Sequence, residues 1–249
     1  MARKLTQHPL AFAATVLLVI VAFLGLDHGS SAYGQLAIGT ATWAVLLATC
    51  LPLSPDERAR VALVVLVATG AEVLGSIVLG AYTYRLENLP AFVPPGHGLV
   101  YLAGLRISQS GPARRHARAF VAATAATVVV WAAVGLALLE RTDLLGALAG
   151  AGLVYMLVRG RAPTLYAGVF VIVAFLELYG TAIGAWHWAE TIPGTPIGAG
   201  NPPSGIASIY VLFDIAAIAL APRLLAAMDS ARRLPPLLRA RRLILNTSG

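Results

Sequence analysis

Long apolar stretches alternate with short polar segments along the whole chain. Six of these stretches are close to or above the roughly 20 apolar residues that one helix needs to cross a bilayer. They cover residues 9–26, 31–53, 61–84, 119–139, 162–186 and 204–222. Two shorter stretches, 96–110 and 144–158, are weaker candidates for the same structure. The pattern therefore predicts an all-α polytopic membrane bundle of about eight transmembrane helices.

The composition agrees with this interpretation. Of the 249 residues, 58% are hydrophobic and 12% are charged, a balance typical of multispanning membrane proteins and not of soluble globular domains. The single cysteine, Cys50, excludes an internal disulfide and a cysteine-based metal site. The first apolar stretch is about 18 residues long, which exceeds the apolar region of a signal peptide, so we expect a retained first helix.

Positive charge is distributed unequally between the two sides of the predicted bundle. With eight helices and an inner N-terminus, all of the 18 Lys and Arg residues except Arg85 and Arg141 fall on inner segments. This bias predicts a multi-pass plasma (inner) membrane protein with both termini in the cytoplasm. The basic tail, 227–249, is expected to lie on anionic inner-leaflet lipids. The net charge of +7 is thus explained by topology, and no nucleic-acid partner is predicted.

The chain contains an internal duplication of about four helices per copy. When Glu72 is placed on Glu177, the following residues align, with slips of one residue: Gly75 with Gly180, Gly80 with Gly184, Tyr82 with Trp186, Tyr84 with Trp188, and Tyr101 near Tyr210. We expect a first repeat at 1–115, a second at 116–226 and then the tail. An even number of helices gives both repeats one orientation, related by an axis along the membrane normal.

Three carboxylic acids lie inside the apolar stretches. Glu72 and Glu177 are each about a dozen residues into their predicted helices and Asp214 is about ten, near the expected middle of the bilayer. A charge there costs a few kcal/mol, so such residues usually face the bundle interior and serve a function. Desolvation favours the protonated form of a buried carboxyl, which makes all three candidate catalytic proton donors. The second half has the richer aromatic rim, and it favours Glu177 as the donor with Asp214 as its partner.

Aromatic and polar residues follow each glutamate and form candidate substrate-binding groups. Tyr82, Tyr84, Trp186 and Trp188 suit a membrane interface, where such a belt needs no function, and their rings could equally stabilise a carbocation. Gly75 and Gly180 could permit close helix packing or leave room for a flat ligand.

Two histidines and an asparagine complete the candidate binding residues, namely His97, His187 and Asn201. The histidines and the two glutamates could be drawn as a metal site. However, Glu177 and His187 are ten residues apart, about 15 Å along a helix, and neither half has a metal-binding helical motif. We therefore predict no metal and no cofactor, and interpret these residues as hydrogen-bonding rim groups.

These motifs resemble those of the carotenoid biosynthesis protein family, which includes carotenoid hydratases. The likeness rests on Glu72, Gly75, Gly80, Tyr82 and Tyr84, then on Gly184, Trp186, Trp188 and Asn201, and covers about 60 of the 249 residues. The PPGHG and GNPPSG turns have no counterpart in the family pattern. The resemblance implies a membrane enzyme that protonates a polyene and adds water.

The leading functional hypothesis is an intramembrane enzyme or pocket protein for a long apolar, isoprenoid substrate. A lyase, a hydratase and a cyclase all remain open. A second hypothesis is a proton-coupled transporter that uses the same carboxylates, although no helix is visibly broken at the midplane. A third is a non-catalytic subunit bound to a membrane-protein partner. Carboxylates that converge on one apolar cavity would favour the first hypothesis.

Overall fold

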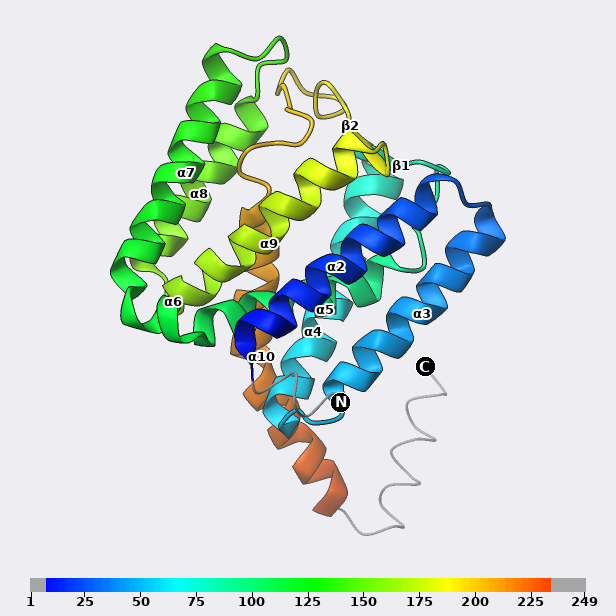
Figure 1. Cartoon of the computed structure of the whole chain (residues 1–249), viewed down its shortest axis with the longest axis vertical. Helices are drawn as coiled ribbons and strands as arrows, with labels where there is room; N and C mark the ends of the chain where they lie inside the picture. Colours follow the sequence, from blue (N-terminus) through cyan, green and yellow to red (C-terminus); the bar gives the residue numbers. More distant parts are fainter. Residues whose placement is uncertain (1–7, 234–249) are drawn as a thin grey trace.

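The computed structural model describes residues 8–233, which form a helical bundle with one short pair of strands (Figure 1). The long helices are α2 (Pro9–His28), α3 (Ala32–Cys50), α4 (Pro55–Glu72), α5 (Val93–Gln109), α7 (Ala117–Ala137), α8 (Leu144–Arg159), α9 (Pro163–Ala182) and α10 (Ala207–Arg233). A π-helical segment, η1 (Val73–Val78), continues α4, and α6 (Gly111–Arg115) links α5 to α7. The strands β1 (Tyr82–Tyr84) and β2 (Trp186–Trp188) pair antiparallel.

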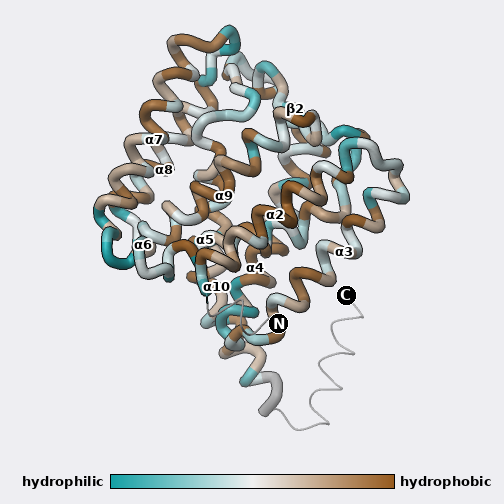
Figure 2. Tube along the Cα trace, in the orientation of Figure 1, coloured by the Kyte–Doolittle hydropathy of each residue, from teal (hydrophilic) through white to brown (hydrophobic). Residues whose placement is uncertain are grey.

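The predicted all-α fold is confirmed for the described residues, and part of the predicted set of about eight membrane helices is supported. Five of the described helices are long and apolar enough to cross a membrane, namely Pro9–His28, Pro55–Val78, Ala117–Ala137, Pro163–Ala182 and Ala207–Ser230. Large apolar side chains lie on the outer faces of the bundle, and Leu18, Leu66 and Val158 are each 69% exposed. Figure 2 shows hydrophobic residues along the helices and hydrophilic ones at their ends.

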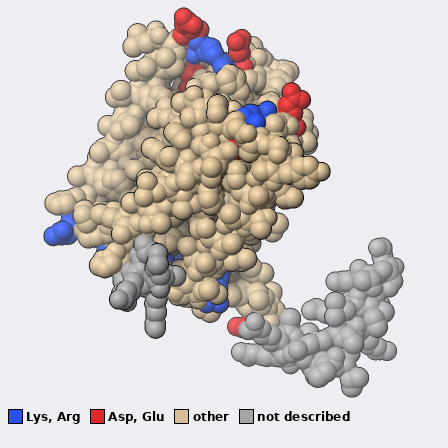
Figure 3. All heavy atoms as spheres, turned by 45° about the vertical axis from the view of Figure 1, so that its right-hand side comes forward, with Lys and Arg blue, Asp and Glu red and all other residues tan. Residues whose placement is uncertain are grey.

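The two ends of the bundle differ in character. β1, β2 and the loops after α2 and α7 lie at one end, which we call the β end (Figure 1). The loop before α4, helix α6 and the loop between α8 and α9 lie at the opposite end, which we call the basic end because it carries Arg58, Arg114 and Arg159. Figure 3 shows charged side chains near the two ends and an almost uncharged surface between them.

Helices α5 and α9 form the centre of the bundle. They pack against each other, α4 packs against α10, and α2 and α3 cover α5. Most of α5 is buried. The backbones of α5 and α9 touch where Gly104 meets Gly168, since a Cβ on either glycine would collide with the facing helix. This contact fixes the height of the two helices relative to each other.

The predicted helices at 61–84 and 162–186 are too long. The α-helix ends at Glu72, η1 ends at Val78, and β1 follows, while α9 ends at Ala182 before β2. Glu72 therefore ends its α-helix, and Glu177 lies in the half of α9 that is closer to the β end. No break interrupts α4 at Glu72: the hydrogen-bond pattern changes there from α-helical to π-helical, and the helix continues to Val78.

The basic tail is described only in part. Residues 227–233 continue α10 as helix, and residues 234–249 lie outside the described residues.

Candidate functional site

A short pairing of β1 with β2 places four aromatic rings together at the β end. In its register Tyr82 faces Trp188, Thr83 faces His187 and Tyr84 faces Trp186. Successive side chains of a strand point to opposite sides. The outer rings of each strand are therefore directed into the bundle, while Thr83 and His187 between them are exposed. The rings thus come from segments about a hundred residues apart in sequence.

Each strand is preceded by a tight turn that only glycine adopts easily. Gly80 has φ of 64° and Gly184 has φ of 70°, values that are strained for residues with a side chain. The next residue in each case hydrogen-bonds back to a glycine carbonyl: Ala81 N to Gly75 O and Ala185 N to Gly180 O, both at 2.8 Å. The sequences GAYTY and GAWHW therefore have the same local geometry.

Gly75 and Gly180 serve as seats for the first ring of each strand. A Cβ on Gly180 would overlap the Trp186 ring, and one on Gly75 would lie 3.0 Å from the Tyr82 ring. The sequence left open whether these glycines permit close helix packing or leave room for a flat ligand. In the structure they leave room for a flat group, but that group is an aromatic side chain of the protein itself. Each glycine is three residues after a glutamate, so seating the ring also brings it to that glutamate.

Glu72 accepts hydrogen bonds from both rings of β1. The hydroxyls of Tyr82 and Tyr84 each donate to Oε2 at 2.7 Å. Burial and the nearby Glu72 charge raise the pKa of both phenols well above its ordinary value, so they remain neutral donors. Glu72 itself is 7% exposed.

His97, from α5, faces the other oxygen of Glu72. Its Nε2 lies 3.2 Å from Oε1, while its Nδ1 lies 3.0 Å from the Val93 carbonyl oxygen. A neutral imidazole carries only one N–H, so two facing acceptors require a further proton, on Nε2 or on the carboxyl. Glu72 and His97 therefore form a pair that can hold and release one proton.

Among the described residues, Glu177 accepts hydrogen bonds only from neutral groups. Trp186 Nε1 and Trp188 Nε1 donate to Oε2 at 3.0 and 3.3 Å, and the Tyr210 hydroxyl, from α10, donates to Oε1 at 3.3 Å. Within residues 8–233 no cationic group lies within ion-pair distance of this carboxyl. The two glutamates therefore have matching ring partners but different charge environments.

Three ring pairs join the surroundings of one glutamate to those of the other. Tyr82 packs on Trp188 with centroids 4.6 Å apart, and His97 stacks on Tyr210 at 5.1 Å. Tyr84 meets Trp186 edge-on at 6.1 Å. In each pair one ring contacts Glu72 and the other contacts Glu177, so the two carboxyls belong to one site.

This site opens onto a cavity of about 450 Å³. The two glutamates, His97 and Tyr210 form part of its wall, together with all four rings of the strands. Apart from Thr42, the remaining wall is apolar and includes Phe23, Leu24, Leu99, Ile206 and Phe213. Leu74 and Leu79 also line it and are 53% and 50% exposed, so the cavity reaches the apolar outer surface beside η1.

The structure does not bring every predicted site residue to this cavity. Asp214 is buried but does not line it, so the expected pairing with Glu177 is not formed. His187 is exposed on β2, and the two-histidine, two-glutamate set permitted by the sequence is not assembled. Asn201 acts on the backbone, since its Oδ1 accepts from Trp188 N at 3.0 Å and thereby supports β2.

Tyr210 and Phe213 are site residues that the sequence reasoning missed. The duplication placed Tyr210 opposite Tyr101, whereas in the structure the residue that lies against Tyr210 is His97. The available signal was that Tyr210 lies one helical turn before Asp214, a residue already identified as unusual.

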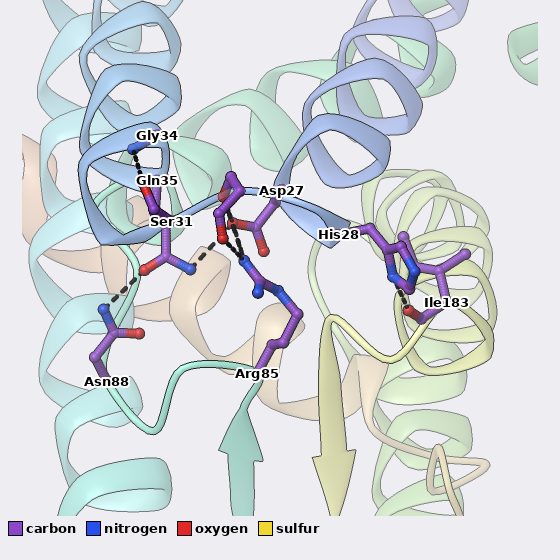
Figure 4. A network of polar contacts seen from close by, with 9 residues as sticks. Asp27, His28, Ser31, Gly34, Gln35, Arg85, Asn88 and Ile183 are labelled. Atoms are coloured by element: carbon purple, nitrogen blue, oxygen red, sulfur yellow. Dashed lines mark hydrogen bonds and ion pairs between the residues drawn. The ribbon is translucent and has the colours of Figure 1, made fainter.

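Two buried aspartates at the β end hold the loops that frame the site. Asp27, in the last turn of α2, accepts from Gln35 Nε2 at 3.1 Å and lies 3.4 Å from Arg85, as Figure 4 shows. Gln35 in turn accepts from Asn88 at 2.7 Å. This network anchors the loop between β1 and α5.

Asp143, before α8, does the same for the loop between β2 and α10. Its carboxylate accepts backbone N–H groups of Gly146, Gly200 and Ser204 at 2.7–2.9 Å. Gly200 and Ser204 flank Asn201, which supports β2. Asp143 therefore acts on the site indirectly, by holding the loop that carries Asn201.

Comparisons of the chain with protein-family models, with curated proteins and with solved structures each gave no match.

Proposed function

We propose that this chain is an integral membrane enzyme that protonates a long apolar substrate of isoprenoid character. The observation that carries the proposal is that two buried glutamates, held by neutral ring donors, face one largely apolar cavity. A cavity of this kind excludes charged and strongly polar ligands, because their desolvation would not be repaid.

The position of the cavity supports entry of the substrate from the lipid. Its wall beside η1 is formed by Leu74 and Leu79, which are half exposed on the apolar surface of the bundle. A lipidic substrate could thus pass sideways from the bilayer without crossing water.

Glu177 is the proposed proton donor. Its hydrogen-bond partners are neutral, and a buried carboxyl without a cation favours its protonated form. The proton moves from the Glu177 carboxyl to one carbon of a carbon–carbon double bond, leaving a carbocation on the other carbon. The faces of the surrounding aromatic rings stabilise that charge by cation–π attraction.

The step that follows decides the product. Water that adds to the cation and returns a proton to the Glu177 carboxylate gives an alcohol, which is a hydratase reaction. Attack by a second double bond of the substrate gives a cyclic carbocation, which loses a proton to the Glu177 carboxylate and leaves a ring with a double bond, which is a cyclase reaction. The Glu72–His97 pair, which lines the same cavity, would orient the attacking water, whose proton returns to Glu177.

We also infer that the helices form two four-helix repeats in parallel orientation, with Glu72 and Glu177 as equivalent residues and both termini in the cytoplasm. The matching turns, ring seats and carboxylate contacts support this repeat. The resemblance to carotenoid biosynthesis proteins fits the proposed substrate class, and the basic tail is proposed to bind anionic inner-leaflet lipids.

A proton-coupled carrier of a lipidic substrate is the second candidate. The change from α-helical to π-helical hydrogen bonding directly after Glu72 favours it, since π-helical segments are frequent at functional sites.

The experiment that tests the enzyme is lipid analysis of isoprenoid-producing cells that express the chain. Wild type should convert one isoprenoid lipid into a more polar or cyclised product, and Glu177→Gln should abolish this, because an amide cannot donate the proton. The matched control is Glu190→Gln, an exposed glutamate just after β2, which should behave as wild type. If Glu177→Gln and Glu72→Gln both retain full conversion at equal membrane abundance, the proposal is wrong.

A further inference from the structure

Asp214 is a buried acid that the proposed chemistry leaves unused. It is 1% exposed, lies one turn after Tyr210 on α10 and does not line the cavity. Within the described part of the chain its Oδ2 has no hydrogen-bond partner. A buried carboxyl without partners is costly, and such residues within a membrane usually serve a path for ions or protons.

Tyr101 has the same relation to His97 that Asp214 has to Tyr210. It lies one turn after His97 on α5 and is 1% exposed, and its hydroxyl also lacks a partner among residues 8–233. The hydroxyl is close enough to Asp214 and Arg60 to be influenced by both charges. Because residues four apart share a helix face, Tyr101 and Asp214 form a second polar layer beneath the His97–Tyr210 layer.

A third layer reaches the surface at the basic end. Arg60 of α4 forms an ion pair with Asp56 at 2.6 Å, and these side chains are 29% and 41% exposed. The Nε of Arg60 is buried and unpaired in the described residues. Arg60 and Glu72 are about 18 Å apart along the axis of α4, and Ala68 between them is buried. A proton that enters beside Arg60 must cover about this distance.

We propose that Asp214 and Tyr101 conduct protons from the basic end of the bundle to the site that contains Glu72 and Glu177. This role rests on the proposed function. The reaction returns a proton to Glu177, but a Glu177 carboxyl that loses its proton to water can donate again only after it is protonated from elsewhere. A proton enters beside Asp56 and Arg60 and passes to the Tyr101 hydroxyl, which gives its own proton to Asp214. Asp214 then donates through one bridging water to the Tyr210 hydroxyl, whose proton moves to Oε1 of Glu177.

Other titratable groups border this route without joining its layers. Glu57 of α4 is held by Arg106 at 3.1 Å at the basic end. Tyr166 of α9 also lies within range of the Asp214 charge, but it is far from the cavity wall by helix position. Tyr166 is therefore a suitable comparison residue.

The test is deuterium exchange of carboxyl groups, followed by infrared spectroscopy of the purified full chain in lipid nanodiscs. The carboxyl band that Glu177→Gln removes reports the Glu177 proton directly and needs no substrate. We expect Asp214→Asn and Tyr101→Phe each to slow its exchange about tenfold or more, which corresponds to about 1.4 kcal/mol in a barrier. Tyr166→Phe should leave the rate unchanged.

The outcomes separate the two proposals. If the band exists but Asp214→Asn and Tyr101→Phe exchange as fast as wild type, the route is wrong and the enzyme proposal stands. Equal slowing by Tyr166→Phe also overturns the route. If Glu177→Gln removes no band, Glu177 is not protonated, and the proposed donor fails together with the route. Circular dichroism of each variant identifies loss of fold as a separate cause.

Discussion

The His97 imidazole stacks on the Tyr210 ring with centroids 5.1 Å apart, and each ring faces a different buried glutamate. The contact crosses the interface between α5 and α10. It therefore ties the proton-holding pair, Glu72 and His97, to the hydroxyl that donates to Glu177. A substitution at one glutamate should therefore alter the hydrogen bonding of the other through this stack.

The Glu72–His97 pair should behave as a unit in stability measurements. Glu72→Gln and His97→Gln each leave one buried member unpaired, which costs about 3–5 kcal/mol for a buried ion pair. The double variant removes both groups, so its melting temperature should fall by less than the sum of the single effects. Strict additivity in a thermal shift assay would show that the two side chains do not interact.

The ring seats should tolerate no added methyl group. Gly180→Ala forces the Trp186 ring away from Glu177 and should destabilise the protein by about 1–3 kcal/mol, with loss of substrate conversion. Gly75→Ala should have a smaller effect because the Tyr82 ring is farther from the added Cβ.

Gly152→Ala is the matched control for the ring seats. Gly152 is also helical, but no other part of the described chain lies within 4 Å of the position that an added Cβ would take, so alanine should leave stability unchanged or raise it through helix propensity. Equal melting temperatures for Gly152→Ala and Gly180→Ala would contradict the seat.

Asp143→Asn should loosen the loop that supports β2. The amide turns a donor toward one of the three backbone N–H groups that the carboxylate now accepts, at a cost of about 1–3 kcal/mol. Limited proteolysis should then cut within residues 189–203 faster than in wild type. Asp229→Asn, at an exposed position on α10, should digest like wild type.

A bulky residue at the mouth of the cavity should block the substrate. Leu74→Trp fills the side of the cavity that reaches the lipid-facing surface, so conversion should fall severalfold while the melting temperature is kept. Leu66→Trp, on the same helix and 69% exposed but away from the cavity, should convert normally. If both variants are equally active, the substrate enters elsewhere.

Topology can be checked by cysteine labelling in a Cys50→Ala background. The charge distribution predicts that Glu190→Cys reacts with a membrane-impermeant reagent added from outside, and that Arg114→Cys reacts only after the membrane is opened. Labelling of position 114 in intact cells would show that the orientation is opposite to the predicted one.

The apolar stretches predicted the helices well, because a bilayer imposes both length and composition on each one. Glu72 and Glu177 could be identified for the same reason, since an acid within an apolar stretch is expensive. Gly80 and Gly184 could also be paired by sequence, and both prove to need a positive φ.

The strand pairing could not be predicted. YTY and WHW are three residues each within apolar stretches, too short for a periodic pattern, and their pairing joins positions about a hundred residues apart. Without it, the rings could be expected only at the interface and not around the glutamates. Asp214 was linked to Glu177 for a similar reason, because sequence gives the depth of a residue along its helix but not the helix face to which its neighbour turns.

The pairing of β1 with β2 also has a consequence for biosynthesis. When the ribosome has released α2 to α5, Glu72 can already bind Tyr82 and Tyr84, but Trp186 and Trp188 have not yet been made. The site therefore closes only when the last quarter of the chain inserts, and until then the first half must wait in the membrane with an open strand edge. Two fragments divided in the α6 segment and produced together should thus rebuild the site from separate polypeptides, whereas neither fragment alone should.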